Sequence, residues 1–217
     1  MHVQYELATV VGHELRNPLG AAMNNLYLQR MALADQVEPE DLDYLDRAET
    51  QINRAAHLSQ DLTAYMRERE PVLGDVNLQE LVAEVLDSAP PPQGIEVTVD
   101  TPVHVVADAT LLGQAITNLL TNAYQAIPEG GRVQLQARAD DGSTVITVTD
   151  DGPGFDSEAT SEPFEPFFST KADGTGLGLA IVARLVELHG GTVSAENLDG
   201  SGARVTVRLP HEKAPQA

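Results

Sequence analysis

The sequence predicts an α+β protein, in which an N-terminal antiparallel helical hairpin precedes an α/β sandwich domain. Apolar residues recur every three or four positions through the first third of the chain, which is the period of an amphipathic helix. Beyond residue 77, short runs rich in Val and Thr alternate with helical stretches, the order expected of a sheet covered by helices. At 217 residues with 42% hydrophobic side chains, the chain is long enough to bury one large core or two smaller ones.

Two long helices make up the expected hairpin, over residues 2–35 and 40–69, with Pro39 suited to start the second. The second helix carries a seven-residue repeat of apolar or small side chains, from Leu45 to Met66. A hairpin alone buries one seam poorly, whereas two copies packed as a four-helix bundle would cover it. We therefore expect a homodimer.

Pro71 and Gly74 interrupt the helical period and mark a domain boundary. The expected divisions are a hairpin at 1–70, a linker at 71–76, a second domain at 77–210 and a tail at 211–217.

The second domain is expected to hold one sheet with helices on one face. Helices are predicted at 77–88, 109–127 and 176–189, and strands at 95–99, 103–105, 132–139, 144–149, 192–196 and 203–209. Asp108 can cap the helix at 109–127, which Pro128 and the glycines after it end.

The formal charge is −20, from 33 acidic and 13 basic residues. Nucleic-acid binding needs a basic surface, so we expect no nucleic-acid partner. A nucleotide is still compatible with this charge, because backbone N–H groups and a metal ion can hold phosphates in a small pocket. The chain has no cysteine, no signal-peptide pattern and no apolar run near the ~20 residues that span a bilayer. We expect a cytoplasmic chain, which could be tethered to a membrane or sensor domain outside this sequence.

A histidine near the N-terminus is the first candidate for chemistry. His13 follows the seam position Gly12, so it is turned about 100° away from the seam and is accessible. Neutral imidazole is a nucleophile near pH 7, and Glu14 beside it could accept or orient its proton. Asn17 lies one turn further on the same face, where it could position a water, and Pro18 can loosen the helix there. A His-Glu pair alone is more often part of a solvated face, but the attached Asn-Pro-Leu favours a functional site.

A second candidate is a stripe of amides on the helix at 109–127. Gln114, Asn118 and Asn122 are spaced four residues apart and lie on one face. Amide side chains offer oxygens to Mg²⁺ and donors to phosphate. The same stripe alone is equally compatible with a surface helix.

Two glycine-bearing segments complete the set of candidates. Asp150-Asp151-Gly152-Pro153-Gly154-Phe155 follows a strand, where a carboxylate could bind an adenine amino group. Gly174-Thr175-Gly176-Leu177-Gly178-Leu179 opens a helix, whose first N–H groups favour phosphate. The polar segment 156–173 between them is a candidate lid, with Lys171 close to the phosphate loop.

Together, the five motifs resemble those of the sensor histidine kinases, over about residues 2–210. The matching segments are HELRNPL at 13–19 for the H box, QAITNLLTNAYQA at 114–126 for the N box, DDGPGF at 150–155 for the G1 box, FEPFFSTK at 164–171 for the F box and GTGLGL at 174–179 for the G2 box. Five motifs in this order are far more specific than any one of them.

The resemblance implies that His13 accepts a phosphoryl group from ATP and that Glu14 assists the transfer. It implies that Asn17 serves the reverse, phosphatase-type reaction on a response regulator, whose receiver Asp otherwise takes the phosphoryl group from His13. Asn118 and Asn122 would hold Mg²⁺ and the phosphates.

The resemblance also implies that Asp150 recognises the adenine base. The pocket and the lid ends would be shaped by Gly152, Gly154, Gly174, Gly176 and Gly178, with Thr175 and Leu177 in the same nucleotide-binding loop.

Two departures from the family pattern bear on these expectations. Gln125 stands where many relatives carry Lys, so phosphate contacts would depend more on Lys171. Only 12 residues precede His13, so the sensor of this family and the upstream part of the first helix are not in this sequence.

Two alternatives remain open at this stage. One is an ATPase of the gyrase, mismatch-repair and chaperone superfamily, which uses a Glu one turn before the metal-binding Asn. Asn118 occupies that position here and cannot act as a base. The other is a degenerate dimerisation module that binds nucleotide without catalysis.

Overall fold

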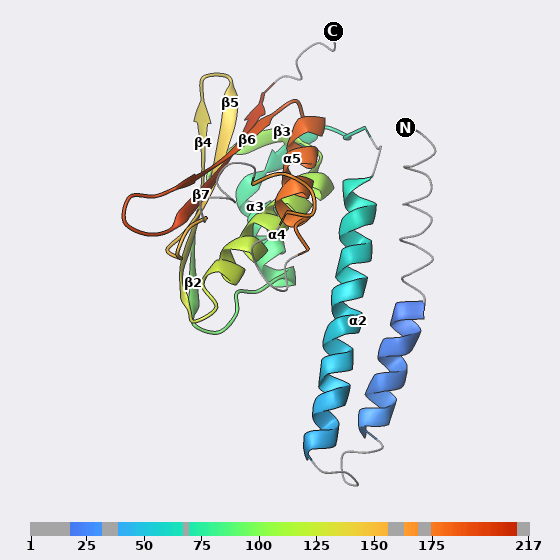
Figure 1. The fold of residues 1–217 in the computed structure, drawn as a ribbon. Coiled ribbons are helices and arrows are strands. Elements are labelled where there is room, and N and C mark those ends of the chain that lie inside the picture. Colours follow the sequence, from blue (N-terminus) through green and yellow to red (C-terminus); the bar gives the residue numbers. More distant parts are fainter. Residues whose placement is uncertain (1–17, 32–38, 67–69, 156–162, 169–174, 212–217) are drawn as a thin grey trace. The chain divides into compact units, whose positions relative to one another are not determined.

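A computed structural model describes residues 18–31, 39–66, 70–155, 163–168 and 175–211. The chain divides into two compact units, residues 1–68 and 69–217, which are described separately below (Figure 1). The α+β class predicted from the sequence is confirmed, with helices first and a mixed sheet after them.

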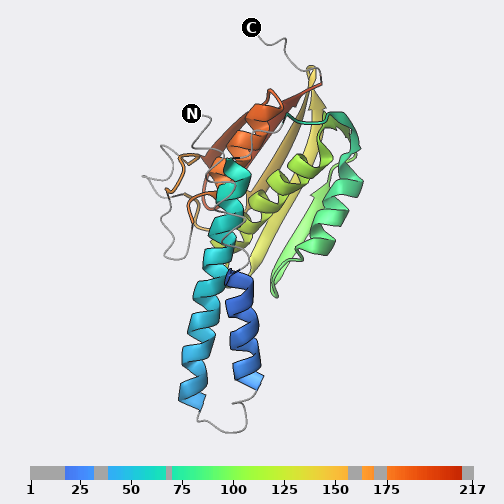
Figure 2. The same cartoon turned by 90° about the vertical axis from the view of Figure 1, so that its right-hand side faces the viewer.

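The N-terminal unit is a pair of antiparallel helices. The described residues 18–31 are helical and lie beside α2 (Pro39–Tyr65) in Figures 1 and 2. Arg30 joins the two helices, with its Nη1 atom 2.7 Å from Asp46 and 3.5 Å from Glu49. These pairs are about half exposed, so they add little to the stability of the hairpin.

The C-terminal unit is built on a five-stranded sheet of order β2-β4-β5-β7-β6. The strand bounds are β2 Ile95–Asp100, β4 Gly131–Asp140, β5 Ser143–Asp150, β6 Thr192–Asn197 and β7 Ala203–Pro210. The β2 and β4 strands are parallel, and the other neighbours are antiparallel.

Three helices cover one face of this sheet: α3 (Leu78–Ser88), α4 (Ala109–Ala126) and α5 (Gly178–Leu188) (Figure 2). The core lies between these helices and the sheet, and its fully buried side chains include Leu78, Ile116, Leu120, Leu135, Ile146 and Ile181. Alternation in β4 explains its part of the core, because Val133, Leu135 and Ala137 all face the helices.

A second, two-stranded sheet differs from the sequence prediction. Strand β1 (Gly74–Asn77) pairs antiparallel with β3 (His104–Ala107). The expected single sheet is therefore wrong in this detail, and the segment 71–76 expected as a linker contains most of β1. Val76 is the only large apolar side chain in β1, so the strand shows no alternation that sequence patterns can detect.

Asp108 is the N-cap of α4, as the sequence predicts. Its Oδ1 atom accepts hydrogen bonds from the backbone N–H groups of Thr110 and Leu111, at 3.0 and 3.2 Å. Its Oδ2 atom accepts a further bond from the N–H of Val72, at 2.9 Å. One buried carboxylate therefore caps the helix and anchors the segment that enters the C-terminal unit.

His189 is the C-cap residue of α5, and its imidazole is buried with a backbone partner at each of its two nitrogens. Nδ1 lies 2.7 Å from the carbonyl oxygen of Leu185, and Nε2 accepts from the N–H of Asp108 at 3.0 Å. A carbonyl can only accept and an N–H can only donate, so these partners hold His189 as the neutral Nδ1–H tautomer.

Candidate functional site

The amide stripe of α4 lies at the edge of the core, between buried and exposed side chains. Asn118 and Asn122 are half-buried, while Leu119, Leu120 and Ala123 pack inside as predicted. In the part of the chain that the structure describes, the Nδ2 atom of Asn118 is buried without a hydrogen-bond partner. A buried donor of this kind requires an acceptor, and a phosphate oxygen would provide one.

The glycine-rich loop meets this stripe at the start of α5. A Cβ atom at Gly178, the first residue of α5, would lie 3.1 Å from Nδ2 of Asn122. A glycine at this position therefore allows the two helices to approach at the asparagine. The fold thus brings the N-box and G2-box residues into contact.

The loop before α5 is shaped by its own side chains. Thr175 Oγ1 accepts a hydrogen bond from the N–H of Leu177 at 3.2 Å. The Leu177 side chain is buried in the core, so any contribution of Leu177 to ligand binding has to come from its backbone. Leu177 is also the N-cap residue of α5 and gives the helix no side-chain cap, so an anion at this end would be favoured.

The acidic loop follows β5 directly. Asp150, the last residue of β5, is buried, and its Oδ1 atom accepts a hydrogen bond from the N–H of Gly152 at 3.0 Å. A Cβ atom at Gly152 would lie 3.1 Å from the carbonyl oxygen of Ala126, the last residue of α4. The first glycine of this loop therefore lets the backbone pass close to the end of the amide-bearing helix.

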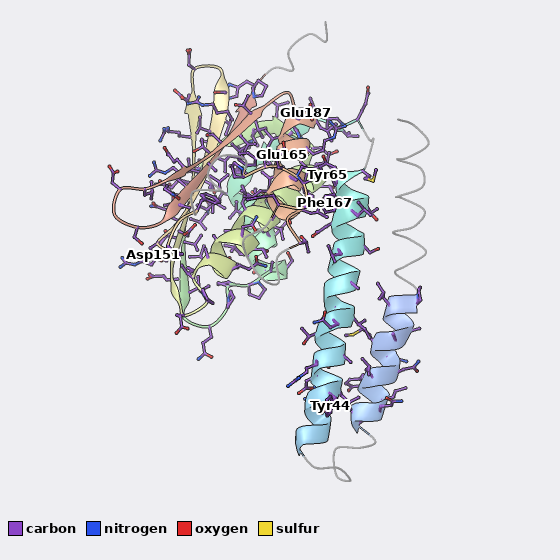
Figure 3. All side chains as sticks on the ribbon, viewed as in Figure 1. Tyr44, Tyr65, Asp151, Glu165, Phe167 and Glu187 are labelled. Atoms are coloured by element: carbon purple, nitrogen blue, oxygen red, sulfur yellow. The ribbon has the colours of Figure 1, made fainter. Side chains whose placement is uncertain are left out.

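Asp151 fixes the same loop to the sheet (Figure 3). Its Oδ1 atom accepts from the N–H of Arg132 at 2.8 Å, and its own N–H donates to the Arg132 carbonyl at 3.2 Å. The second carboxylate of the loop is thus structural, which leaves Asp150 as the candidate for ligand recognition.

Two phenylalanines bring the lid segment to the glycine-rich loop. The N–H of Phe167 donates to the carbonyl oxygen of Gly176 at 2.9 Å, and both residues have left-handed backbone angles. A Cβ atom at Gly176 would lie 2.7 Å from the backbone nitrogen of Phe168. The Phe167 side chain is 67% exposed, whereas Phe164 packs against the core. The F-box and G2-box segments therefore dock backbone to backbone.

Tyr124 lies next to the stripe but faces the core. Burial raises the pKa of its phenol, so the side chain is uncharged over the physiological range. Tyr124 is part of the hydrophobic core of the C-terminal unit.

Several predicted site residues lie outside the described residues, namely His13, Glu14, Asn17, Lys171 and Gly174. Their roles stay predictions. Within the described residues, no group of three or more His, Asp or Glu side chains could hold a metal ion. A magnesium ion at Asn118 and Asn122 would therefore have to complete its coordination with phosphate oxygens and water.

Sequence reasoning missed two residues that hold the acidic loop. Asn197, at the end of β6, makes two hydrogen bonds to the backbone of Phe155. Ser201 Oγ donates to the carbonyl oxygen of Gly152 at 2.6 Å. They lie at the end of β6 and in the turn after it, and nothing in the local sequence separates them from ordinary polar residues of such a segment.

Comparisons with known proteins agree with this arrangement of motifs. Residues 3–71 match the His Kinase A (phospho-acceptor) domain, and residues 107–213 match the histidine kinase-, DNA gyrase B- and HSP90-like ATPase family. The signal transduction histidine-protein kinase AtoS of Escherichia coli is 34% identical over 94% of this chain and 34% of its own length.

Solved structures are similar to the chain as well. The mycobacterial sensor histidine kinase MprB is 33% identical over 66% of this chain and all of that structure, with a TM-score of 0.59. Full-length ShkA in complex with AMPPNP is 28% identical over 97% of this chain and 47% of its own, with a TM-score of 0.74. ThkA in complex with the response regulator protein TrrA is 26% identical over 97% of this chain and 63% of its own, with a TM-score of 0.69.

The segments that carry the N, G1, F and G2 motifs contact one another in a unit that matches the histidine kinase-, DNA gyrase B- and HSP90-like ATPase family. The phospho-acceptor match at the N-terminus narrows the class, and the chain belongs to the sensor histidine kinase family. It spans about a third to a half of the length of the curated relatives it matches. None of its described helices is both long and apolar enough to cross a bilayer.

Proposed function

We propose that the chain is the catalytic core of a two-component sensor histidine kinase. Residues 1–70 would serve as the dimerisation and phosphotransfer hairpin, and residues 77–210 as the ATP-binding domain. The observation that carries the proposal is that one chain joins a phospho-acceptor match at 3–71 to a unit whose four nucleotide motifs contact one another.

The pocket residues fit an ATP molecule with Mg²⁺. The buried Nδ2 atom of Asn118 needs an acceptor, and the start of α5 beside Asn122 favours an anion. Asp150, held by Gly152, would bind the adenine amino group. Asn118 and Asn122 would hold Mg²⁺, which would neutralise phosphate charge.

His13 would be the nucleophile. A bond forms between one imidazole nitrogen and the γ-phosphorus of ATP, and the bond from that phosphorus to the β,γ-bridging oxygen breaks, so ADP leaves. Glu14 would orient the imidazole and accept its proton. The phosphoryl group would then pass to an Asp carboxylate of a response regulator, which regenerates His13.

Two partners follow from the family. A second copy of this chain would complete a four-helix bundle with the hairpin. A response-regulator receiver domain would take the phosphoryl group, as the ThkA–TrrA complex pairs a kinase with such a regulator. Asn17 would support the reverse, phosphatase-type reaction on the same partner.

The test is incubation of the full chain with ATP labelled at the γ-phosphate. We expect label that is labile in acid and stable in base, as a phosphorus–nitrogen bond requires, and its transfer to purified receiver domains. His13→Gln should abolish the label, and His57→Gln provides a matched control on the same hairpin that should keep it.

Label that persists in His13→Gln would show that another residue is the acceptor. Steady ATP hydrolysis without any phosphoprotein would favour an ATPase of the gyrase and chaperone type. Nucleotide binding without hydrolysis or label would favour a degenerate binding module.

A further inference from the structure

The end of β6 and the turn after it pack against the G1 loop, residues 150–155. Asn197 uses its side-chain amide to bind both backbone groups of one residue. Its Oδ1 atom accepts from the N–H of Phe155 at 2.7 Å, and its Nδ2 atom donates to the Phe155 carbonyl at 2.8 Å. An amide in this position pairs with Phe155 as a neighbouring β-strand would.

Two glycines make this close approach possible. Gly154 has a φ of +82°, and a Cβ atom on it would lie 2.7 Å from Oδ1 of Asn197. Gly202 has a φ of +103°, and a Cβ atom on it would collide with the carbonyl oxygen of Asp150. The second glycine of the G1 motif therefore makes room for Asn197, a reason distinct from shaping the nucleotide pocket.

Ser201 adds a third contact from the same turn. Its Oγ atom donates to the carbonyl oxygen of Gly152 at 2.6 Å, and Gly152 in turn donates its N–H to Oδ1 of Asp150. Gly152, which binds the carboxylate of Asp150, is thus held by the turn after β6, next to the Asn197 that holds Phe155.

The exposure of these contacts separates a positioning role from a purely stabilising one. Asn197 is exposed, so loss of its two hydrogen bonds would leave no buried polar group unpaired and would cost the overall fold little. Its two bonds instead select one position of the loop that carries Asp150. A ligand that binds only the selected position gains affinity in proportion to how much that position is populated.

We propose that Asn197 is a positioning residue of the nucleotide site, which holds the G1 loop through Phe155 in the form that binds the base. This inference rests on the proposed function, because it assumes that the G1 loop contacts a nucleotide. Asn197 itself takes no part in phosphoryl transfer.

The test compares Asn197→Ala and Asn197→Asp in the full chain, with ADP and Mg²⁺ as the probe in a calorimetric titration. Loss of both bonds in Asn197→Ala should raise the Kd for ADP by roughly tenfold. Asn197→Asp keeps an acceptor for the Phe155 N–H but sets a carboxylate oxygen against the Phe155 carbonyl, so its Kd should also rise.

The matched control is Glu196→Ala. Glu196 precedes Asn197 on β6. It forms an exposed ion pair with Arg204 at 3.3 Å, and neither residue belongs to the G1 loop. Its Kd for ADP should stay within about twofold of the unmodified chain. Melting followed by circular dichroism, without nucleotide, then separates folding from binding in every variant.

The kinetic signature is a rise in KM for ATP with the rate of His13 labelling at saturating ATP retained within about threefold. An unchanged Kd in both Asn197 variants, or an equal rise in Glu196→Ala, would overturn the inference. If Asn197→Ala does not fold, the Kd of Asn197→Asp for ADP alone tests the inference. An unmodified chain that binds no nucleotide overturns the proposed function instead, so the two failures are distinguishable.

Discussion

His189 links the two helices that carry the nucleotide motifs. It accepts from the backbone of Asp108 at the start of α4 and donates to Leu185 on α5. Asp108 in turn binds the N–H of Val72. A single neutral imidazole therefore satisfies two buried backbone groups that belong to different elements.

Replacing His189 should destabilise the C-terminal unit. His189→Leu leaves the Asp108 N–H and the Leu185 carbonyl without partners in a buried site, so we expect a loss of about 2–4 kcal/mol in the free energy of unfolding. Urea denaturation followed by circular dichroism measures it.

His104 supplies the matched control for this change. It lies on β3 and contacts Asp75 at 3.0 Å, with both side chains more than half exposed. His104→Gln should alter the free energy of unfolding by less than about 0.5 kcal/mol. Equal losses in the two variants would mean that the His189 contacts contribute nothing specific.

At the scale of elements, the contact between α4 and α5 depends on Gly178. A Cβ atom there would press on the amide of Asn122, which must then move by a few tenths of an ångström. We expect Gly178→Ala to weaken Mg²⁺-ADP binding about tenfold or more while the fold is retained, because the displaced amide belongs to the proposed phosphate site. Calorimetric titration of the full chain provides the measurement.

The control is the other glycine within these helices, Gly113 on α4. A Cβ atom at Gly113 would make an ordinary contact, 3.4 Å from Cδ1 of Leu81. Gly113→Ala should keep nucleotide affinity and stabilise the helix by about 0.5–1 kcal/mol. Unchanged ADP affinity in Gly178→Ala would contradict the proposed role of the Asn122 contact.

Elements with strong local signals could be predicted from the sequence. The Asp108 cap and the proline after α4 place that helix within one residue of its observed end. The alternation of apolar and polar side chains predicts strands β4 and β5 within one residue of their observed ends. Local chemistry determines these features, so the sequence alone is sufficient.

Features that depend on distant contacts could not be predicted. Asn197 binds a residue 42 positions away, and His189 binds one 81 positions away. Strand β1 forms only because β3 pairs with it. In the site, motif order identified the segments, but which backbone groups dock against each other depends on tertiary packing.

At the scale of the whole molecule, the hairpin leaves apolar side chains for a second copy. Tyr27, Leu28, Met31 and Tyr44 are each more than half exposed, and Figure 3 labels Tyr44 near the start of α2. The seam residue Ile52 is half-buried in the single chain. These observations favour the proposed dimer.

A charge in the seam should therefore dissociate the dimer. We expect Ile52→Asp to raise the dimer Kd by about a hundredfold or more, since it places a carboxylate in an apolar interface. Sedimentation equilibrium over a range of protein concentrations measures this change.

Asn53→Asp adds the same charge at the neighbouring, exposed position and should leave the dimer intact. Helicity measured by circular dichroism shows whether the hairpin survives in each variant. If the unmodified chain sediments as a monomer at every concentration, the proposed dimer is wrong.

The strand order of the five-stranded sheet also bears on solubility. Strands β2 and β6 are its two edges, and each edge offers main-chain groups to which a strand of another molecule could add. Glu96 and Asp100 stand exposed on β2 and Glu196 on β6, and they share the sign of the net charge of −20. Two molecules that meet edge to edge would bring carboxylates together, so the acidic composition disfavours association through these two strands.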